Sequence, residues 1–198
     1  MLARRRALGS RGGKRLVVCV VGMPGSGKSV VSRVAREVGF DVVVMGDAVR
    51  DVARERGIEP SGKAMRELMQ ALRHEGGPAV VAKLCFPRID RAGQLVLVDG
   101  IRSLHEVEAF RGRYGNVVLI AVHSSPRTRF KRLRARGRED DPRTWEEFRK
   151  RDEVELKVGI GSAIALADFM LVNEGTLEEL EGAARELLEK LVREANGR

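Results

Sequence analysis

The sequence contains no uninterrupted apolar stretch of about 18 residues, the length that a membrane-spanning helix needs. We therefore expect no membrane partner. The 198 residues are 43% hydrophobic and 33% charged, a composition that argues against a wholly disordered chain and fits one globular domain. A glycine-rich stretch follows the basic N-terminus where a secretory signal would have an apolar segment, so we expect no export.

Cysteine and histidine are scarce and scattered. Cys19 and Cys85 lie far apart and form no Cys-x-x-Cys pair, and the three histidines show no metal-ligand spacing with them. The pattern indicates neither a disulfide framework nor a zinc site, and Cys19 lies in an apolar run that predicts a buried thiol. Such cysteine usage is typical of a reducing compartment, and we predict a cytoplasmic location.

Acidic residues are absent from the first 15 positions, which contain six cationic side chains. The formal net charge of the whole chain is +9, so these six account for most of the excess. We predict that residues 1–14 form a basic flexible tail outside the folded domain. Such a tail could contact nucleic acid, but the charge of the remaining chain does not indicate a nucleic-acid-binding fold. No feature of the sequence indicates the oligomeric state.

Short apolar runs alternate with longer helical patterns along residues 15–198, which we expect to form a single domain. This alternation is typical of an α/β protein with a parallel sheet and helices on both faces. Continuously apolar runs, as in strands buried on both faces, predict a five-stranded parallel sheet from residues 15–21, 41–45, 95–99, 117–123 and 168–172. Two further segments are too long for simple crossovers and predict helical insertions that cover a substrate, at 57–92 and, as a lid, at 124–156.

Helix-start and helix-stop signals place the expected helices more closely. Helical patterns cover residues 29–38, 47–56 and 103–113. Ser125 and Pro126 predict the start of a further helix that ends at Gly137. Thr176 and Glu179 form the pattern of a capping box, and leucines at helical spacing follow them.

Between the first strand and the first helix, the sequence GMPGSGKS fits the pattern G-x-x-x-x-G-K-[ST]. In this pattern glycines let backbone N–H groups surround phosphate oxygens, and the N-terminus of the next helix favours anions. The lysine neutralises the β- and γ-phosphates, and the hydroxyl ligates Mg²⁺. We therefore predict an ATP site formed by Gly22, Met23, Pro24, Gly25, Ser26, Gly27, Lys28, Ser29 and Val30.

Asp99 ends the third apolar run, at the strand edge that lies beside this loop in a parallel sheet. A carboxylate in that place holds Mg²⁺ through water, so Ser29 and Asp99 are the predicted metal ligands. The next residue is Gly100, whereas motor-type ATPases usually carry a second acid there to activate water. The chain also lacks the N-K-x-D signature of GTPases. These two absences favour a kinase.

A kinase needs a second anion site, and arginines follow two of the predicted strands. Arg50 and Arg102 each come just after a strand end marked by Gly-Asp or Asp-Gly, on the edge where α/β sheets bind ligands. Residues 127–138 add seven cationic side chains and no acid, with Arg129, Arg132 and Arg136 on one helical face. Uncompensated like charges at this spacing destabilise a helix, which favours a phosphate-binding role.

Together these residues resemble the nucleoside-monophosphate kinases, and most closely an archaeal group related to adenylate kinase and dephospho-CoA kinase. The resemblance covers residues 15–195. It includes GDAVR, which is similar to the acceptor-binding G-D-x-x-R; GGPAVVAKL, which resembles the end of the acceptor-binding insertion; and ADFMLVNEGTLEEL, which resembles the last strand and the loop beside the donor adenine. The lid pattern implies that phosphates and the transferring group are held by Arg132, Arg136, Arg138 and Arg149.

The resemblance implies an ATP- and Mg²⁺-dependent phosphotransferase with Lys28 on the donor phosphates and Asp47, Arg50 and Arg102 at the acceptor. The chain departs from adenylate kinases at Met45, where they carry threonine, and around Arg102, where neither the proline nor the adenine-reading glutamine is present. The acceptor is therefore left open between a nucleoside monophosphate and a hydroxyl such as that of dephospho-CoA, for which Asp47 is the candidate base. The alternative is a P-loop ATPase of nucleic-acid processing or assembly that docks through the basic tail.

Overall fold

Five parallel strands form one sheet in the computed structural model, which describes residues 15–59 and 61–197. The predicted tail, residues 1–14, lies outside them. The strand order is β2-β3-β1-β4-β5, and the strands are β1 (Leu16–Val21), β2 (Asp41–Val44), β3 (Leu95–Ile101), β4 (Val117–His123) and β5 (Phe169–Val172). The predicted α/β fold, a five-stranded parallel sheet with helices on both faces, is confirmed. The central strand β1 has β3 and β4 as neighbours, so its end is the topological switch point where α/β sheets bind ligands.

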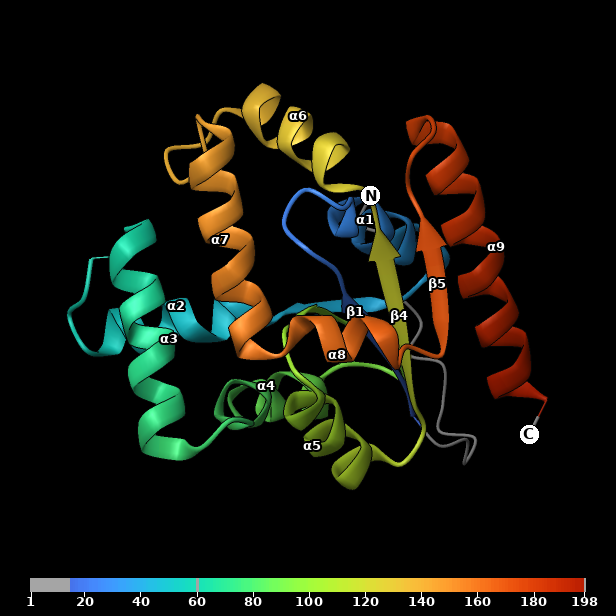
Figure 1. Cartoon of the computed structure of the whole chain (residues 1–198). Helices are drawn as coiled ribbons and strands as arrows, with labels where there is room; N and C mark the ends of the chain where they lie inside the picture. Colours follow the sequence, from blue (N-terminus) through green and yellow to red (C-terminus); the bar gives the residue numbers. More distant parts are fainter. Residues whose placement is uncertain (1–14, 60, 198) are drawn as a thin grey trace, which may run out of the picture.

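Helices cover both faces of the sheet (Figure 1). Alternate residues of β1 point to opposite sides, and each side has its own apolar core. Leu16, Val18 and Val20 pack with α1 (Lys28–Val38) and α9 (Leu177–Asn196). Val17 and Cys19 pack with residues of the opposite layer, which consists of α2 (Met45–Glu55), α4 (Val80–Arg91), α5 (Leu104–Tyr114) and α8 (Ile160–Ala165).

The two predicted insertions consist largely of helices. α3 (Gly62–Gly76) precedes α4, and α6 (Pro126–Arg136) and α7 (Trp145–Val158) follow β4. In Figure 1, α6 passes over the carboxyl end of the sheet and α7 descends beside α3. The segment 137–144 between α6 and α7 packs close to the start of α3, because a Cβ at Gly62 would lie 3.1 Å from Cβ of Asp140. Both insertions therefore border the edge of the sheet that carries the phosphate loop.

Most element boundaries agree with the local sequence signals. Ser125 accepts a hydrogen bond as the N-cap of α6, Pro126 is its first residue, and Gly137 ends it with φ 66°. The capping box at Thr176 and Glu179 is present. Two strand ends differ from the prediction: Met45, which is apolar and buried, opens α2 instead of extending β2, and β3 continues past Asp99 to Ile101, which pairs with Val21. No helix within the described residues is long and apolar enough to cross a membrane.

Candidate active site at the carboxyl edge of the sheet

The loop 22–27 between β1 and α1 has a shape that only glycine permits at three positions. Gly25 and Gly27 adopt positive φ angles of 83° and 106°, and Gly27 is the N-cap of α1. At Gly22, a Cβ would collide with the carbonyl of Val122 on β4. At Gly27 it would collide with the side chain of Asn173, which follows β5. The glycines therefore let the loop pack directly on the ends of two strands.

Side chains from those two strand ends hold the loop in place. The carbonyl of Ser26 accepts hydrogen bonds from Nδ2 of Asn173 at 2.8 Å and from Oγ of Ser124 at 3.3 Å. Ser26 is fully buried, and its own hydroxyl makes no hydrogen bond within the described part of the chain. Gly27, Lys28 and Ser29 at the start of α1 line the adjoining cavity, and the first N–H groups of a helix have no partner inside it. This arrangement of N–H groups fits a bound phosphate chain.

Lys28 lies along the same loop. Its Nζ donates hydrogen bonds to the carbonyls of Gly22 at 2.6 Å and Met23 at 3.4 Å. Burial lowers the pKa of Lys28 to about 8, although the nearby Asp99 carboxylate opposes this effect. Among the other neighbours, Arg102 also lowers this pKa. The ammonium is therefore a positive charge that an anion beside it would stabilise.

Ser29 and Asp99 both line the cavity next to Lys28. Oδ2 of Asp99 accepts a hydrogen bond of 2.9 Å from the buried hydroxyl of Ser32, which orients the carboxylate. A serine hydroxyl and a carboxylate at a strand end are the oxygen donors that Mg²⁺ takes when phosphates and water complete its shell. No cluster of three or more metal-ligating side chains occurs in the part of the chain that the structure describes. The donor set therefore fits Mg²⁺ bound together with a nucleotide.

A cavity of about 480 Å³ extends from the phosphate loop across the carboxyl edge of the sheet. Its wall draws on the loop, α2, α3, α4, the end of β3, and the α6–α7 region. The cationic residues that line it are Lys28, Arg73, Arg102, Arg132, Arg136, Arg138 and Arg151, and the acidic ones are Asp99, Glu106, Asp140 and Glu155. Positive charge therefore predominates in a space that begins at the phosphate loop.

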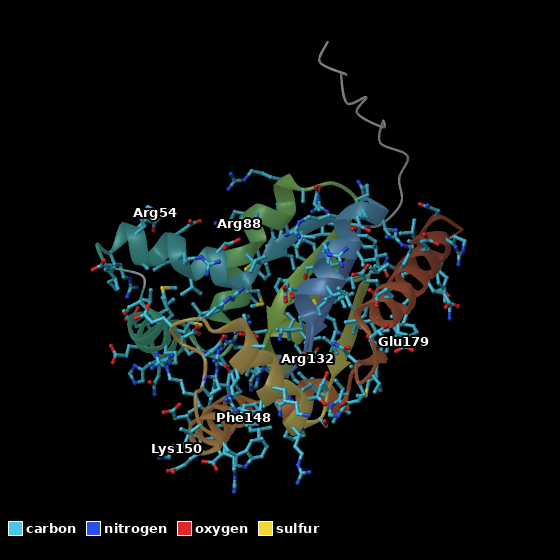
Figure 2. The ribbon with its side chains drawn as sticks, turned by 90° about the horizontal axis from the view of Figure 1, so that it is seen from above. Arg54, Arg88, Arg132, Phe148, Lys150 and Glu179 are labelled. Atoms are coloured by element: carbon cyan, nitrogen blue, oxygen red, sulfur yellow. The ribbon has the colours of Figure 1, made fainter. Side chains whose placement is uncertain are left out.

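Most of these arginines are held by partners distant in the sequence. Arg132 donates to the hydroxyl of Ser124 at 2.9 Å and to Oδ1 of Asn173 at 3.1 Å, the two side chains that also hold the loop. Figure 2 shows Arg132 near the centre of the molecule. Nη1 of Arg102 donates to both carboxylate oxygens of Glu155, at 3.0 and 3.1 Å. These bonds fix where each guanidinium meets the cavity.

Arg136 and Arg138 differ in how firmly they are held. Arg136 forms a two-pronged pair with Asp141 at 2.9 and 2.5 Å, and this pairing lowers the pKa of the Asp141 carboxyl. The backbone N–H of Arg138 donates to the same carboxylate at 3.0 Å, but its guanidinium has no partner among the residues that the structure describes. Arg138 therefore presents an uncommitted positive charge to the cavity.

Comparison with known proteins places this arrangement in a family. A sequence profile described as an AAA domain matches residues 21–149, more than half of the chain. A UPF0200 protein from Hyperthermus butylicus is 55% identical over 181 residues, which are 91% of this chain and 97% of that protein. The chain belongs to the UPF0200 family.

Solved structures share the fold of this UPF0200 chain at low sequence identity. A shikimate kinase from Bacteroides thetaiotaomicron has a TM-score of 0.62 at 14% identity and covers 88% of this chain and 98% of its own. A gluconokinase from Sinorhizobium meliloti has a TM-score of 0.52 at 15% identity and covers 92% of this chain and 96% of its own. These likenesses show a P-loop kinase-like fold, and the kinase resemblance inferred from the sequence is confirmed.

The idea of an uncompensated basic face on α6 is wrong for this UPF0200 chain. Arg129 is buried and forms a two-pronged pair with Asp152, at 2.9 and 2.6 Å. Arg136 pairs with Asp141 in the same way. Both carboxylates belong to residues that follow α6 in the sequence, so the spacing within α6 alone could not predict them. The face is compensated, and within 127–138 the residues that reach the cavity are Arg132, Leu133, Arg136 and Arg138.

Of the predicted acceptor and lid residues, three lie outside the wall of the cavity. Asp47 and Arg50, on α2, form an ion pair with each other, and both side chains are about half exposed. Arg149 is exposed on α7. Arg151, two residues further along α7, does line the cavity, and it donates to the carbonyl of Asp140 at 2.8 Å. The structure thus places Lys28, Ser29, Asp99, Arg102, Arg132, Arg136 and Arg138 around one space and leaves Asp47, Arg50 and Arg149 beside it.

Sequence reasoning missed a second set of residues: Arg73, Glu106, Arg151 and Glu155. The signal for the last two was present in the phase of α7. Phe148 is buried, and Arg151, Asp152 and Glu155 follow it at three, four and seven residues, which places them on its face of the helix. Arg73 had no comparable signal, because its contact with Glu106 depends on how α3 packs near α5.

Proposed function

We propose that this protein is an ATP- and Mg²⁺-dependent phosphotransferase that acts on a small nucleotide-like acceptor. One observation carries the proposal. The cavity lined by Lys28 and Ser29 is also lined by Arg102, by Arg138 and by residues of α2, α3 and α4. An ATPase that only hydrolyses its nucleotide has no need of such further space beside the phosphate loop. A kinase needs that space, because donor and acceptor must meet in line.

At the donor end, each group has a separate task. The loop N–H groups and Lys28 would hold the donor phosphates, and Ser29 and Asp99 would hold the metal. Bound Mg²⁺ supplies charge neutralisation on the phosphate oxygens. Arg132, Arg136, Arg138 and Arg151 would surround the transferring group. Arg138 has the greatest freedom to follow it, since its guanidinium is committed to no carboxylate in the described structure.

The far end of the cavity favours a heterocycle over a sugar acid. Its walls include Met45, Val49, Met69 and Val81, which provide apolar surface for a flat ring. Between them, Nη2 of Arg73 lies 3.4 Å from Oε1 of Glu106, and Nε of Arg73 is buried without a partner in the described structure. A guanidinium donates hydrogen bonds and a carboxylate accepts them. Together they suit the uncharged edge of a nucleobase, which carries both acceptors and donors. The carboxylate would repel the carboxylate of a sugar acid placed against it.

The position of Asp47, the candidate base predicted from the sequence, bears on the nature of the acceptor group. A hydroxyl acceptor requires a base within reach of the reacting atoms, and Asp47 faces Arg50 outside the cavity wall. A phosphate acceptor requires only charge neutralisation, which the arginines supply. We therefore favour a nucleoside monophosphate over a hydroxyl of the dephospho-CoA type. The roles of Arg50 at the acceptor and of Arg149 in the lid remain predictions, as does the cytoplasmic location.

The test is phosphoryl transfer from ATP labelled at the γ-phosphate. The acceptors are the common nucleoside monophosphates, dephospho-CoA, shikimate and gluconate, and Lys28→Ala is the control for a contaminating kinase. We expect label on at least one nucleoside monophosphate and none on the two acids. Label in free phosphate alone would contradict the proposal. It would favour the P-loop ATPase that docks through residues 1–14, and deletion of those residues would then abolish RNA-stimulated hydrolysis.

A further inference from the structure

One buried guanidinium connects the phosphate loop with the helix on the opposite side of the cavity. The side chain of Arg129, on α6, is 4% exposed. It donates to the carbonyl of Pro24 in the loop at 3.3 Å, to the carbonyl of Ser124 at 3.1 Å and to both oxygens of Asp152 on α7. Its charge also lies 4.9 Å from the ring of Phe148. Loop, strand end and α7 thus meet at a single side chain.

The first turns of α6 also touch the loop directly. A Cβ at Gly25 would lie 2.9 Å from the carbonyl oxygen of Arg129 and 3.1 Å from Cγ of Leu133. The loop therefore cannot shift toward α6 without moving Arg129. Because Arg129 bonds α7 through two short parallel hydrogen bonds, a displacement of the loop would be transmitted to Asp152.

Asp152 lies on α7 between two residues that line the cavity, Arg151 and Glu155. Arg151 precedes it and lines the cavity wall. Glu155, three residues later, accepts both hydrogen bonds from Nη1 of Arg102. The contacts therefore run without a break from the carbonyl of Pro24, through Arg129, Asp152 and one turn of α7, to Glu155 and Arg102.

We propose that Arg129 and Asp152 are a positioning pair that couples occupancy of the phosphate loop to the placement of Arg151 and Arg102. The assignment of those two arginines to the transferring group and the acceptor rests on the proposed function. Arg129 and Asp152 themselves do not line the cavity. They act through α7, whose position relative to the loop they set.

A buried ion pair can also serve stability alone, and the test must separate the two roles. Removing one partner leaves an uncompensated buried charge and is strongly destabilising, whereas replacing both by apolar residues is often tolerated. The main variant is therefore Arg129→Met with Asp152→Leu. Its matched control is Arg33→Met with Glu181→Leu, which removes an ion pair between α1 and α9, outside the cavity wall.

The measurement is backbone hydrogen exchange of the full chain with and without adenylyl imidodiphosphate and Mg²⁺. In wild type and in the control, we expect the nucleotide to slow exchange both in residues 22–30 and in α7. In the main variant, we expect slower exchange in residues 22–30 but not in α7. Nucleotide-dependent protection of α7 that is equal in the main variant and wild type would overturn the proposal.

Two additions keep the result interpretable. If the main variant does not fold, Arg129→Lys keeps the buried positive charge, but a single ammonium lacks the planar fork that reaches Pro24 and both oxygens of Asp152. It should then show reduced protection of α7, and full protection would count against the pair. In transfer assays the pair predicts a lower kcat at an unchanged KM for ATP. Protection of α7 in a wild-type protein that transfers no phosphoryl group would sink the proposed function and leave the pair standing.

Discussion

The two ends of the cavity are built in different ways. At the donor end, eight consecutive residues supply the phosphate loop, whose glycines allow its shape and whose backbone is held by hydrogen bonds from two strand ends. At the acceptor and lid end, single side chains from α3, α6, α7 and the segment after β3 converge, and most are paired with a carboxylate from another element. A site built from backbone groups can come from one short segment of the sequence. A site built from side chains of several helices depends on how those helices pack.

The largest expected effect comes from the arginine without a partner. Replacing Arg138 by alanine should reduce kcat by about 10³-fold, as loss of an arginine that stabilises a transferring phosphoryl group does. Nucleotide affinity should change little, since the loop and Lys28 would hold most of the donor phosphates. Single-turnover transfer and titration with a fluorescent ATP analogue would measure the two quantities. An undiminished transfer rate would remove Arg138 from the mechanism.

A paired comparison on α7 tests whether structure or motif locates the second lid arginine. Arg151→Ala should lower kcat by about 10²-fold, because Arg151 lines the cavity. Arg149→Ala should have a much smaller effect, because this side chain is exposed outside the cavity wall. Steady-state kinetics at saturating ATP would compare them. A larger loss of kcat in Arg149→Ala than in Arg151→Ala would favour Arg149, the residue that the lid motif indicates.

At the acceptor end, Glu106→Gln should change selectivity more than rate. Burial raises the pKa of Glu106, although its hydrogen bond from the N–H of Arg102 opposes the shift. The amide keeps the shape but removes the charge beside Arg73, so we expect KM for the preferred acceptor to rise by about tenfold, the equivalent of one charged hydrogen bond. KM for ATP should stay constant. An equal change in both KM values would argue against a place at the acceptor end.

The smallest effect concerns pH at the donor end. The pKa of Lys28 in the free protein is lowered to about 8, and bound phosphates would raise it. Nucleotide binding should therefore take up a proton above pH 8, and affinity should fall by about tenfold from pH 8 to pH 9.5 while staying nearly constant below pH 7.5. Calorimetric titrations in buffers of different ionisation enthalpy would count the protons. No uptake at pH 8.5 would show that Lys28 is already fully charged when free.

The contrast between the two ends also explains what the sequence could predict. The parallel sheet and the phosphate loop, with Ser29, follow from apolar runs and from one contiguous motif, whereas the strand order was not predicted. Asp99 follows from the end of the third apolar run. In contrast, the compensation of Arg129 by Asp152 spans 23 residues, and the contact of Arg73 with Glu106 spans 33. No local periodicity encodes such pairs, because the packing of separate helices decides them.

The side-chain directions of the predicted acceptor and lid residues also depend on packing. The spacing of the lid motif selected Arg149, but the phase of α7 around the buried Phe148 turns Arg151 to the cavity. Asp47 and Arg50 have the expected position after β2, yet they bond to each other across one turn of α2. Placing a residue on the right element does not determine which way its side chain points.

The hydrogen bonds that hold the carbonyl of Ser26 have a thermodynamic consequence. Asn173 and Ser124 bind its carbonyl in the folded chain, so part of the ordering of the loop backbone, about 1–2 kcal/mol of entropy per residue, takes place when the protein folds. A nucleotide that binds later loses less affinity to loop ordering than it would at a loop without these bonds. The strength of nucleotide binding is thereby partly set by residues after β4 and β5, which lie about 100 and 150 positions from the loop that they hold.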